Sequence, residues 1–136
     1  MAERGSGGII NVASTAGYQP IPYLSVYAAS KAYVISFSEA LAAELSGRGV
    51  RVFTVSPGAT RSEFGEAAGI SAKFTQQFDR FAASAEGLVK RSLDAYERQV
   101  WGDSYIDGTL NRAGAWLSAF TPSFALTHLA AGWLRR

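Results

Sequence analysis

The segment GGIINVASTAGYQPIPYLSVYAASKAYVISFSEALAAELSGRGVRVFTVSPG, residues 7–58, decides the fold of this chain. Gly8–Ser14 is an apolar run with β-branched residues, a pattern typical of a strand that is covered on both faces. From about Ser25 the pattern becomes helical, rich in alanine and leucine, and it stops at Gly47–Gly49. Val50–Val55 then alternates as a second strand. A strand, a long helix and a strand without a hairpin turn predict a βαβ unit with parallel strands and a right-handed crossover.

The residues after this unit predict a loop followed by helices. Residues 59–82 contain glycines and phenylalanines without a clear period, and we expect a mobile loop with short helices there. Ser84 is placed to cap a helix that ends at about Arg98, with Glu86 in its first turn. The other predicted elements are a very short strand at Val100-Trp101 and two apolar helices, Leu110–Phe120 and Pro122–Leu134, the second capped by Thr121-Pro122.

The composition restricts the classes of function. The chain has 136 residues, 48% of them hydrophobic and 18% charged, which fits one globular domain. A net charge of +2 with interspersed acidic and basic residues does not favour a nucleic-acid partner. The absence of cysteine excludes thiol catalysis, and a single histidine, His128, argues against a metal cluster or a Ser-His-Asp triad. No stretch approaches the ~20 apolar residues of a membrane span and no secretory signal is visible, so we expect a cytoplasmic protein without a metal.

Residues 27–31, YAASK, carry the candidate chemistry. In a helix, Tyr27 and Lys31 lie on one face about one turn apart. A free tyrosine titrates near ~10, and a nearby cation favours the phenolate form of a phenol. Ser14 ends the first predicted strand, and ligands bind outside the carboxyl ends of strands in an open parallel sheet. Each residue alone also has a purely structural interpretation. The tyrosine could lie at the edge of the core, the lysine could be a solvated surface charge, and the serine could be an ordinary polar residue at the end of a strand. Their places at the boundaries of one βαβ unit favour a common site.

Three segments of this sequence resemble the short-chain dehydrogenase/reductase family. GGIINVASTAG resembles the family's catalytic-serine strand, YAASK its Tyr-x-x-x-Lys signature, and VRVFTVSPGATRSEF the next strand with its nicotinamide loop. The resemblance runs from about Gly5 to Phe64. It implies an α/β fold: a truncated, Rossmann-like, doubly wound parallel sheet of two or three strands with flanking helices. The single domain, 1–136, then comprises a catalytic βαβ core at about 1–64 and a substrate loop with C-terminal helices at 65–136.

The resemblance also implies an activity, hydride transfer between NAD or NADP and a small-molecule carbonyl or alcohol. In that mechanism Tyr27 is the general acid/base at the substrate oxygen. Lys31 stabilises the phenolate of Tyr27 and binds the nicotinamide ribose, while Ser14 holds the substrate oxygen. The cofactor performs the redox step, and the protein positions and polarises the substrate.

The turn after the second strand is expected to receive the nicotinamide. By resemblance, Pro57 and Gly58 face its carboxamide. Thr60 stands where the family often has an aliphatic residue, and Ser62 keeps a hydroxyl where the family often has threonine. With Tyr27 and Lys31, the expected cofactor-binding residues are thus Pro57, Gly58, Thr60 and Ser62.

The family's first strand, glycine-rich turn and adenosine-ribose acidic residue have no counterpart in this sequence. Gly5–Gly8 lacks the G-x-G-x-x-G spacing, since Ile10 stands in the third glycine's place. We therefore expect a C-terminal half that binds cofactor weakly on its own. The alternative is a non-catalytic remnant that acts as an oligomerising or binding module, since family members commonly dimerise through the long helix. An open strand edge and uncovered apolar surface favour a homo-oligomer.

The apolar tail allows two interpretations. A helix lying in a membrane interface would suit the aromatic residues Trp116, Phe120, Phe124 and Trp133 and the terminal Arg135-Arg136. Because no strong basic face accompanies them, packing of the tail helices on the body or on a partner is favoured. No membrane partner is therefore expected.

Overall fold

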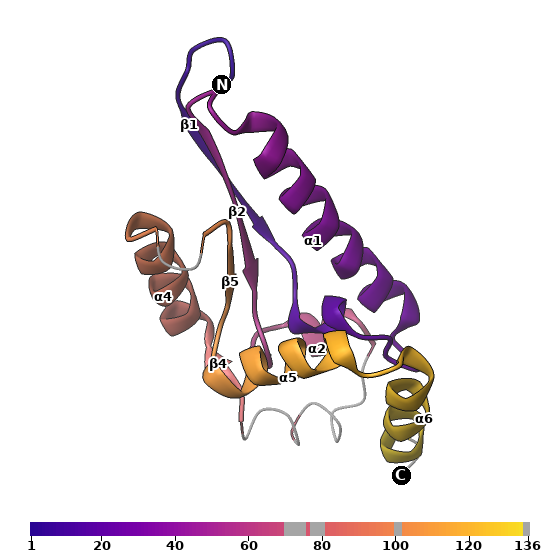
Figure 1. Ribbon diagram of the computed structural model, residues 1–136. Coiled ribbons are helices and arrows are strands. Elements are labelled where there is room, and N and C mark those ends of the chain that lie inside the picture. The colour runs from indigo at the N-terminus through magenta and orange to yellow at the C-terminus, as the bar shows by residue number, and fades with distance from the viewer. Residues whose placement is uncertain (70–75, 77–80, 100–101, 135–136) are drawn as a thin grey trace.

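A parallel three-stranded sheet forms the centre of the computed structural model, which describes residues 1–69, 76, 81–99 and 102–134 (Figure 1). The first two strands, β1 (Gly7–Val12) and β2 (Val50–Ser56), are joined by α1 (Ser25–Leu45). They pair in parallel along the whole of β1. The predicted βαβ unit and the α/β parallel-sheet fold are therefore confirmed. β5 (Ser104–Ile106) pairs in parallel with the other side of β2.

Most of the shorter elements gather near the carboxyl ends of the strands (Figure 1). A second, two-stranded parallel sheet pairs Thr60 with Ala83 and Arg61 with Ser84. Besides the strands β1, β2 and β5 and the helix α1, the described elements are the 3-10 helix η1 (Thr15–Tyr18), β3 (Thr60–Arg61), α2 (Phe64–Ala67), β4 (Ala83–Ser84), α4 (Ala85–Glu97), α5 (Thr109–Phe120) and α6 (Ser123–Leu134). None of the described helices is long and apolar enough to cross a membrane.

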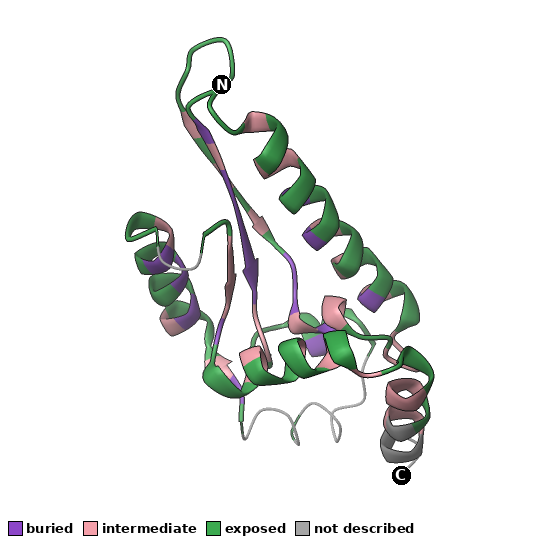
Figure 2. Cartoon of the chain, viewed as in Figure 1, coloured by how far each residue is buried: buried purple, intermediate pink, exposed green. Residues whose placement is uncertain are grey.

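The buried centre of the sheet is β2 (Figure 2). Val52 and Phe53 are 1% and 0% exposed. Phe53 packs edge-on against Tyr96 of α4, with the ring centroids 5.5 Å apart. Successive side chains of a strand point to opposite faces, so Val52 points to the other face, where α1 packs. Cover on both faces explains why almost all residues of β2 are buried, whereas β1, for which such cover was predicted, alternates between half-buried and exposed residues.

The N-terminal boundary of α4 is confirmed, whereas the first strand ends earlier than predicted. Ser84 caps α4, and its Oγ accepts a hydrogen bond from Gly87 N at 3.1 Å. The first strand ends at Val12, and Ser14 is instead the N-cap of η1. Ser14 leaves the strand because its Oγ accepts from Ala16 N, the local side-chain bond that favours caps over strands.

In the C-terminal third, one predicted strand lies outside the described residues and the start of the last helix differs from the prediction. Val100-Trp101 lies outside the described residues, and the described short strand is Ser104–Ile106. The last helix begins at Ser123 rather than at Pro122. The Thr121 hydroxyl, which was predicted to cap this helix, donates to Leu117 O in α5. In the predicted loop 59–82, the described residues include β3 and α2, and β4 follows at Ala83–Ser84; residues 70–75 and 77–80 lie outside the described part.

Candidate active site

Backbone hydrogen bonds extend the sheet beyond the ends of its strands. Ala13 N donates to Val55 O at 2.8 Å, and Thr15 N donates to Pro57 O at 2.8 Å. These two bonds hold Ser14 beside the turn that follows β2. The carboxyl edge of the sheet, where ligands bind in open parallel sheets, therefore brings two of the predicted site segments together.

Ser14 is nearly buried, with 9% of its surface exposed. Its Oγ accepts a hydrogen bond from Ala16 N at 3.1 Å. Among the described residues no acceptor takes the hydroxyl proton of Ser14. The side chain is thus oriented by its lone pair and keeps a donor for another oxygen.

Tyr27 and Lys31 lie together on α1, as their spacing predicts. The Lys31 ammonium is 5.8 Å from the centroid of the Tyr27 ring. The same ammonium donates to Val12 O at 3.0 Å, which places it at the carboxyl end of β1. On its other side the Tyr27 ring contacts Phe64 of α2, with ring centroids 5.0 Å apart. Sequence patterns did not reveal this contact between a helix and a distant loop.

Gly17 sets the distance between η1 and α1. A Cβ at this position would lie 2.7 Å from Ile35 Cδ1, 2.8 Å from the Lys31 carbonyl carbon and 2.9 Å from Ala32 N. η1 therefore packs directly on the backbone of the helical turn that carries Lys31. No local sequence pattern distinguishes Gly17 from an ordinary turn glycine, so this close contact could not be predicted.

The turn after β2 has a fixed backbone. The Thr60 hydroxyl donates to Gly58 O at 3.1 Å, and Ala83 N donates to Ala59 O at 2.9 Å. Ser62 is exposed in front of α2, where its Oγ accepts from Phe64 N at 3.4 Å. The Thr60 hydroxyl is thus used in a hydrogen bond within its own loop, whereas the Ser62 side chain is exposed to solvent.

A family profile described as short chain dehydrogenase matches residues 1–72, which is more than half of this chain. The chain belongs to the short chain dehydrogenase family. The resemblance inferred from the serine strand, the YAASK segment and the Pro-Gly turn is confirmed at this level.

Individual members of the short chain dehydrogenase family match parts of the chain. A short chain dehydrogenase from Pseudocercospora fijiensis is 48% identical over 65 residues, which cover 48% of this chain and 21% of that protein. A short-chain dehydrogenase from Sphingobium yanoikuyae, solved with NADPH, gives a TM-score of 0.70 at 31% identity, covering 87% of this chain and 44% of that one. A Burkholderia cenocepacia short chain dehydrogenase, solved with NADP, gives 0.69 at 26% identity, covering 92% and 47%. The chain spans about a fifth of the first relative and less than half of the two solved chains.

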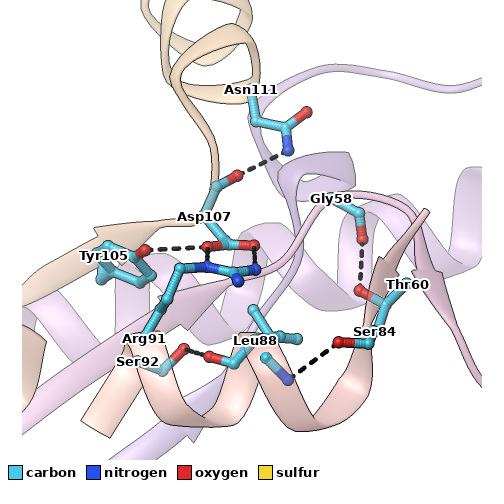
Figure 3. Close-up of polar contacts among 10 residues, drawn as sticks. Gly58, Thr60, Ser84, Leu88, Arg91, Ser92, Tyr105, Asp107 and Asn111 are labelled. Carbon is cyan, nitrogen blue, oxygen red and sulfur yellow. Dashed lines mark hydrogen bonds and ion pairs between the residues drawn. The ribbon is translucent and has the colours of Figure 1, made fainter. Parts of the chain in front are cut away.

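An ion pair that the sequence did not reveal lies beside the turn after β2 (Figure 3). Arg91 of α4 binds both carboxylate oxygens of Asp107, each at 2.8 Å, and the Tyr105 hydroxyl donates to the same carboxylate at 2.9 Å. The Asp107 side chain is 8% exposed and that of Arg91 is 48% exposed. The hydrogen bonds from Arg91 lower the pKa of Asp107. Burial, and then the bond to Asp107, raise the pKa of Tyr105.

Arg91→Ala should lower the free energy of unfolding by about 1–2 kcal/mol at neutral pH, because it leaves a buried carboxylate with Tyr105 as its remaining donor. Half exposure of Arg91 keeps the loss below that of a fully buried pair. Since the pKa of Asp107 is lowered by folding, its contribution is present above the unfolded value near ~4 and is lost as pH falls through the folded pKa. Urea unfolding at neutral pH and at about pH 2 measures both effects.

Arg98→Ala, an exposed residue just after α4, is the matched control for Arg91→Ala. It should change the free energy of unfolding by less than about 0.5 kcal/mol at either pH. Equal losses in the two variants, or a loss in Arg91→Ala that persists undiminished in acid, would contradict the assignment.

Proposed function

We propose that this chain carries the catalytic residues of an NAD(P)-dependent oxidoreductase that transfers hydride between nicotinamide and a small-molecule carbonyl or alcohol. The observation that carries the proposal is the placement of Tyr27 and Lys31. The Lys31 ammonium lies 5.8 Å from the Tyr27 ring centroid and 3.0 Å from Val12 O, at the carboxyl end of β1. Membership of the short chain dehydrogenase family supports it, as do the relatives solved with NADPH and NADP.

Tyr27 acts as the general acid in carbonyl reduction. Its hydroxyl proton passes to the carbonyl oxygen while hydride reaches the carbonyl carbon. The cofactor, when bound, supplies that hydride or accepts it in the reverse direction. Lys31 stabilises the phenolate that Tyr27 becomes, because Val12 O holds the ammonium close to the ring. In alcohol oxidation the same phenolate takes the proton.

Ser14 donates a hydrogen bond to the substrate oxygen. Its oxygen already accepts from Ala16 N at 3.1 Å, and this bond orients the hydroxyl while leaving its proton for the substrate. The near burial of Ser14 strengthens such a bond, since little water competes for it.

The turn after β2 fits the nicotinamide end of the cofactor. Pro57 and Gly58 lie at the carboxyl edge of the sheet, beside Ser14, because Thr15 N donates to Pro57 O at 2.8 Å. Thr60 secures this turn through its bond to Gly58 O. Ser62 adds an exposed hydroxyl for a further contact. These residues, with Tyr27 and Lys31, are the ones that would hold the nicotinamide and its ribose.

Oxidation of NADH and NADPH in the presence of ketones and aldehydes tests the proposal. Because Gly5–Gly8 leads into β1, which begins at Gly7, instead of joining a strand to a helix N-terminus, we expect weak affinity for the diphosphate, and the cofactor must be supplied in excess. A carbonyl-dependent rate that falls in Lys31→Met would support the assignment. The absence of any such rate with both cofactors would refute it.

A second candidate function is assembly with other copies of the chain. Large apolar side chains are exposed on α1 and β1 (Figure 2): Val26 is 83%, Tyr33 68% and Val12 59% exposed. Tyr33 stacks on Phe37 with ring centroids 5.9 Å apart, so the two form one patch. Among the described residues β1 pairs only with β2, and its outer edge carries no strand. Open edges and apolar patches of this kind favour association.

Phe37→Glu should dissociate such an assembly, because it places a charge in the apolar patch of α1. Sedimentation velocity at micromolar concentration should give a dimer or larger species for the unaltered chain and a monomer for the variant. Val89→Glu is the control, since Val89 is similarly exposed on α4. An unaltered chain that sediments as a monomer would remove the assembly function.

A further inference from the structure

Asn111, in the first turn of α5, carries its side-chain amide beside two glycines, Gly58 and Gly108. Its Nδ2 donates to Asp107 O at 2.7 Å. A Cβ on Gly108 would lie 3.2 Å from the same nitrogen, and a Cβ on Gly58 would overlap it. The amide of Asn111 therefore packs directly against the backbone of the turn after β2. It occupies space that side chains at positions 58 and 108 would need.

The anchor of this amide is rigid. The Asp107 carboxylate is held by two hydrogen bonds from Arg91 and one from Tyr105, each 2.8 or 2.9 Å long. The backbone of Asp107 is held as well, since its N–H donates to Ser56 O at 3.3 Å. Charge-assisted, two-pronged bonds of this kind fix orientation as well as distance. The Asn111 side chain, which donates to Asp107 O, is therefore held in a fixed position at the carboxyl edge of the sheet.

The Asn111 amide also contacts Gly58, and the Gly58 carbonyl accepts a hydrogen bond from the Thr60 hydroxyl at 3.1 Å. We propose that Asn111 is a positioning residue, which presses on Gly58 and holds the Gly58–Thr60 backbone at the height where nicotinamide binds. This inference rests on the proposed function for its catalytic consequence. Its structural half, that Asn111 restrains the turn, stands on the contacts alone.

Hydrogen exchange measures the restraint without any cofactor. In Asn111→Ala the amides of residues 59–61 should exchange about tenfold faster, because one hydrogen bond and its packing no longer oppose local opening. The amides of Val52 and Thr54 in β2 should be unchanged. Thr121→Val is the matched control, since it removes another side chain-to-backbone bond of α5. Unchanged exchange at 59–61, or equal acceleration there in the control, would overturn the proposal.

A double-mutant cycle tests the contact itself. Gly58→Ala should raise the unfolding equilibrium constant about tenfold when Asn111 is present, because the new methyl group meets its amide. In the Asn111→Ala background the same change should have an effect at least threefold smaller, since contacting residues are not additive. Strictly additive effects would show that Asn111 does not bear on Gly58.

The kinetic readout separates this inference from the proposed function. Asn111→Ala should raise KM for the nicotinamide cofactor about tenfold and change kcat less than threefold, the pattern of lost binding rather than lost chemistry. A loss confined to kcat would overturn the positioning role. If the unaltered chain turns over no carbonyl substrate with either cofactor, the proposed function fails, and hydrogen exchange still decides whether Asn111 restrains the turn.

Discussion

Tyr27→Phe should lower the rate of carbonyl reduction by about 10²- to 10⁴-fold, the usual contribution of a general acid. The substitution removes the transferable proton and keeps the ring, so the contact with Phe64 at 5.0 Å is preserved. The Lys31 ammonium also keeps its bond to Val12 O. The fold should therefore be intact, and kcat should fall far more than the affinity for the cofactor.

Tyr33→Phe provides the control for this experiment. Tyr33 lies on the same helix, is 68% exposed, and stacks on Phe37 through its ring, which phenylalanine retains. Steady-state rates of NAD(P)H oxidation at saturating carbonyl substrate compare the two variants. Retention of most activity in Tyr27→Phe, or an equal loss in Tyr33→Phe, would remove Tyr27 from the mechanism.

Gly17→Ala should destabilise the chain by about 3 kcal/mol, near the upper end for an overpacked site. The added methyl group meets Ile35 and the backbone of Lys31 and Ala32 at less than 3.0 Å. Two of these three atoms belong to the backbone of α1, which cannot turn aside as a flexible side chain would. Either η1 or the catalytic turn of α1 must move, so activity should fall along with stability.

Gly114→Ala separates this effect from the general consequences of replacing a glycine. A Cβ at Gly114 has no heavy atom within 4 Å, and the residue lies inside α5. Alanine there should be stabilising by about 0.5–1 kcal/mol, because it favours helix more than glycine does. Urea denaturation of both variants gives the comparison. A Gly17→Ala protein as stable as the unaltered chain would show that η1 and α1 are not in tight contact.

The sheet and its long helix could be predicted because their signals are local. Val50–Val55 alternates and ends at a Pro-Gly turn, and the alanine-rich pattern of α1 begins at Ser25 and stops just before Gly47. The family match also depends on local motifs, and these were visible in the sequence. Ser14 was misplaced by a short distance because a capping hydrogen bond competes with strand pairing, and a sequence pattern does not weigh the two.

The contacts that fix the site could not be predicted in the same way. Arg91 meets Asp107, and Asn111 meets Gly58, across long separations in the chain. Such pairs arise only when β5 is placed beside β2 and α5 crosses the strand ends. Resemblance to a cofactor turn accounts for Gly58 in the sequence, and the structure adds a second reason for a glycine there, the amide of Asn111.

The pairing of β3 with β4 has a consequence for how this scaffold can diversify. Thr60 pairs with Ala83 and Arg61 pairs with Ser84, so the two ends of segment 62–82 lie next to each other. A segment whose two ends are held together by strand pairing can be replaced by a segment of another sequence or length without moving its flanks. Doubling the length of a loop costs only ~0.6 kcal/mol in closure entropy. Grafts of different length between Arg61 and Ala83 should therefore be tolerated, while the long helix and the turn after β2 keep their places.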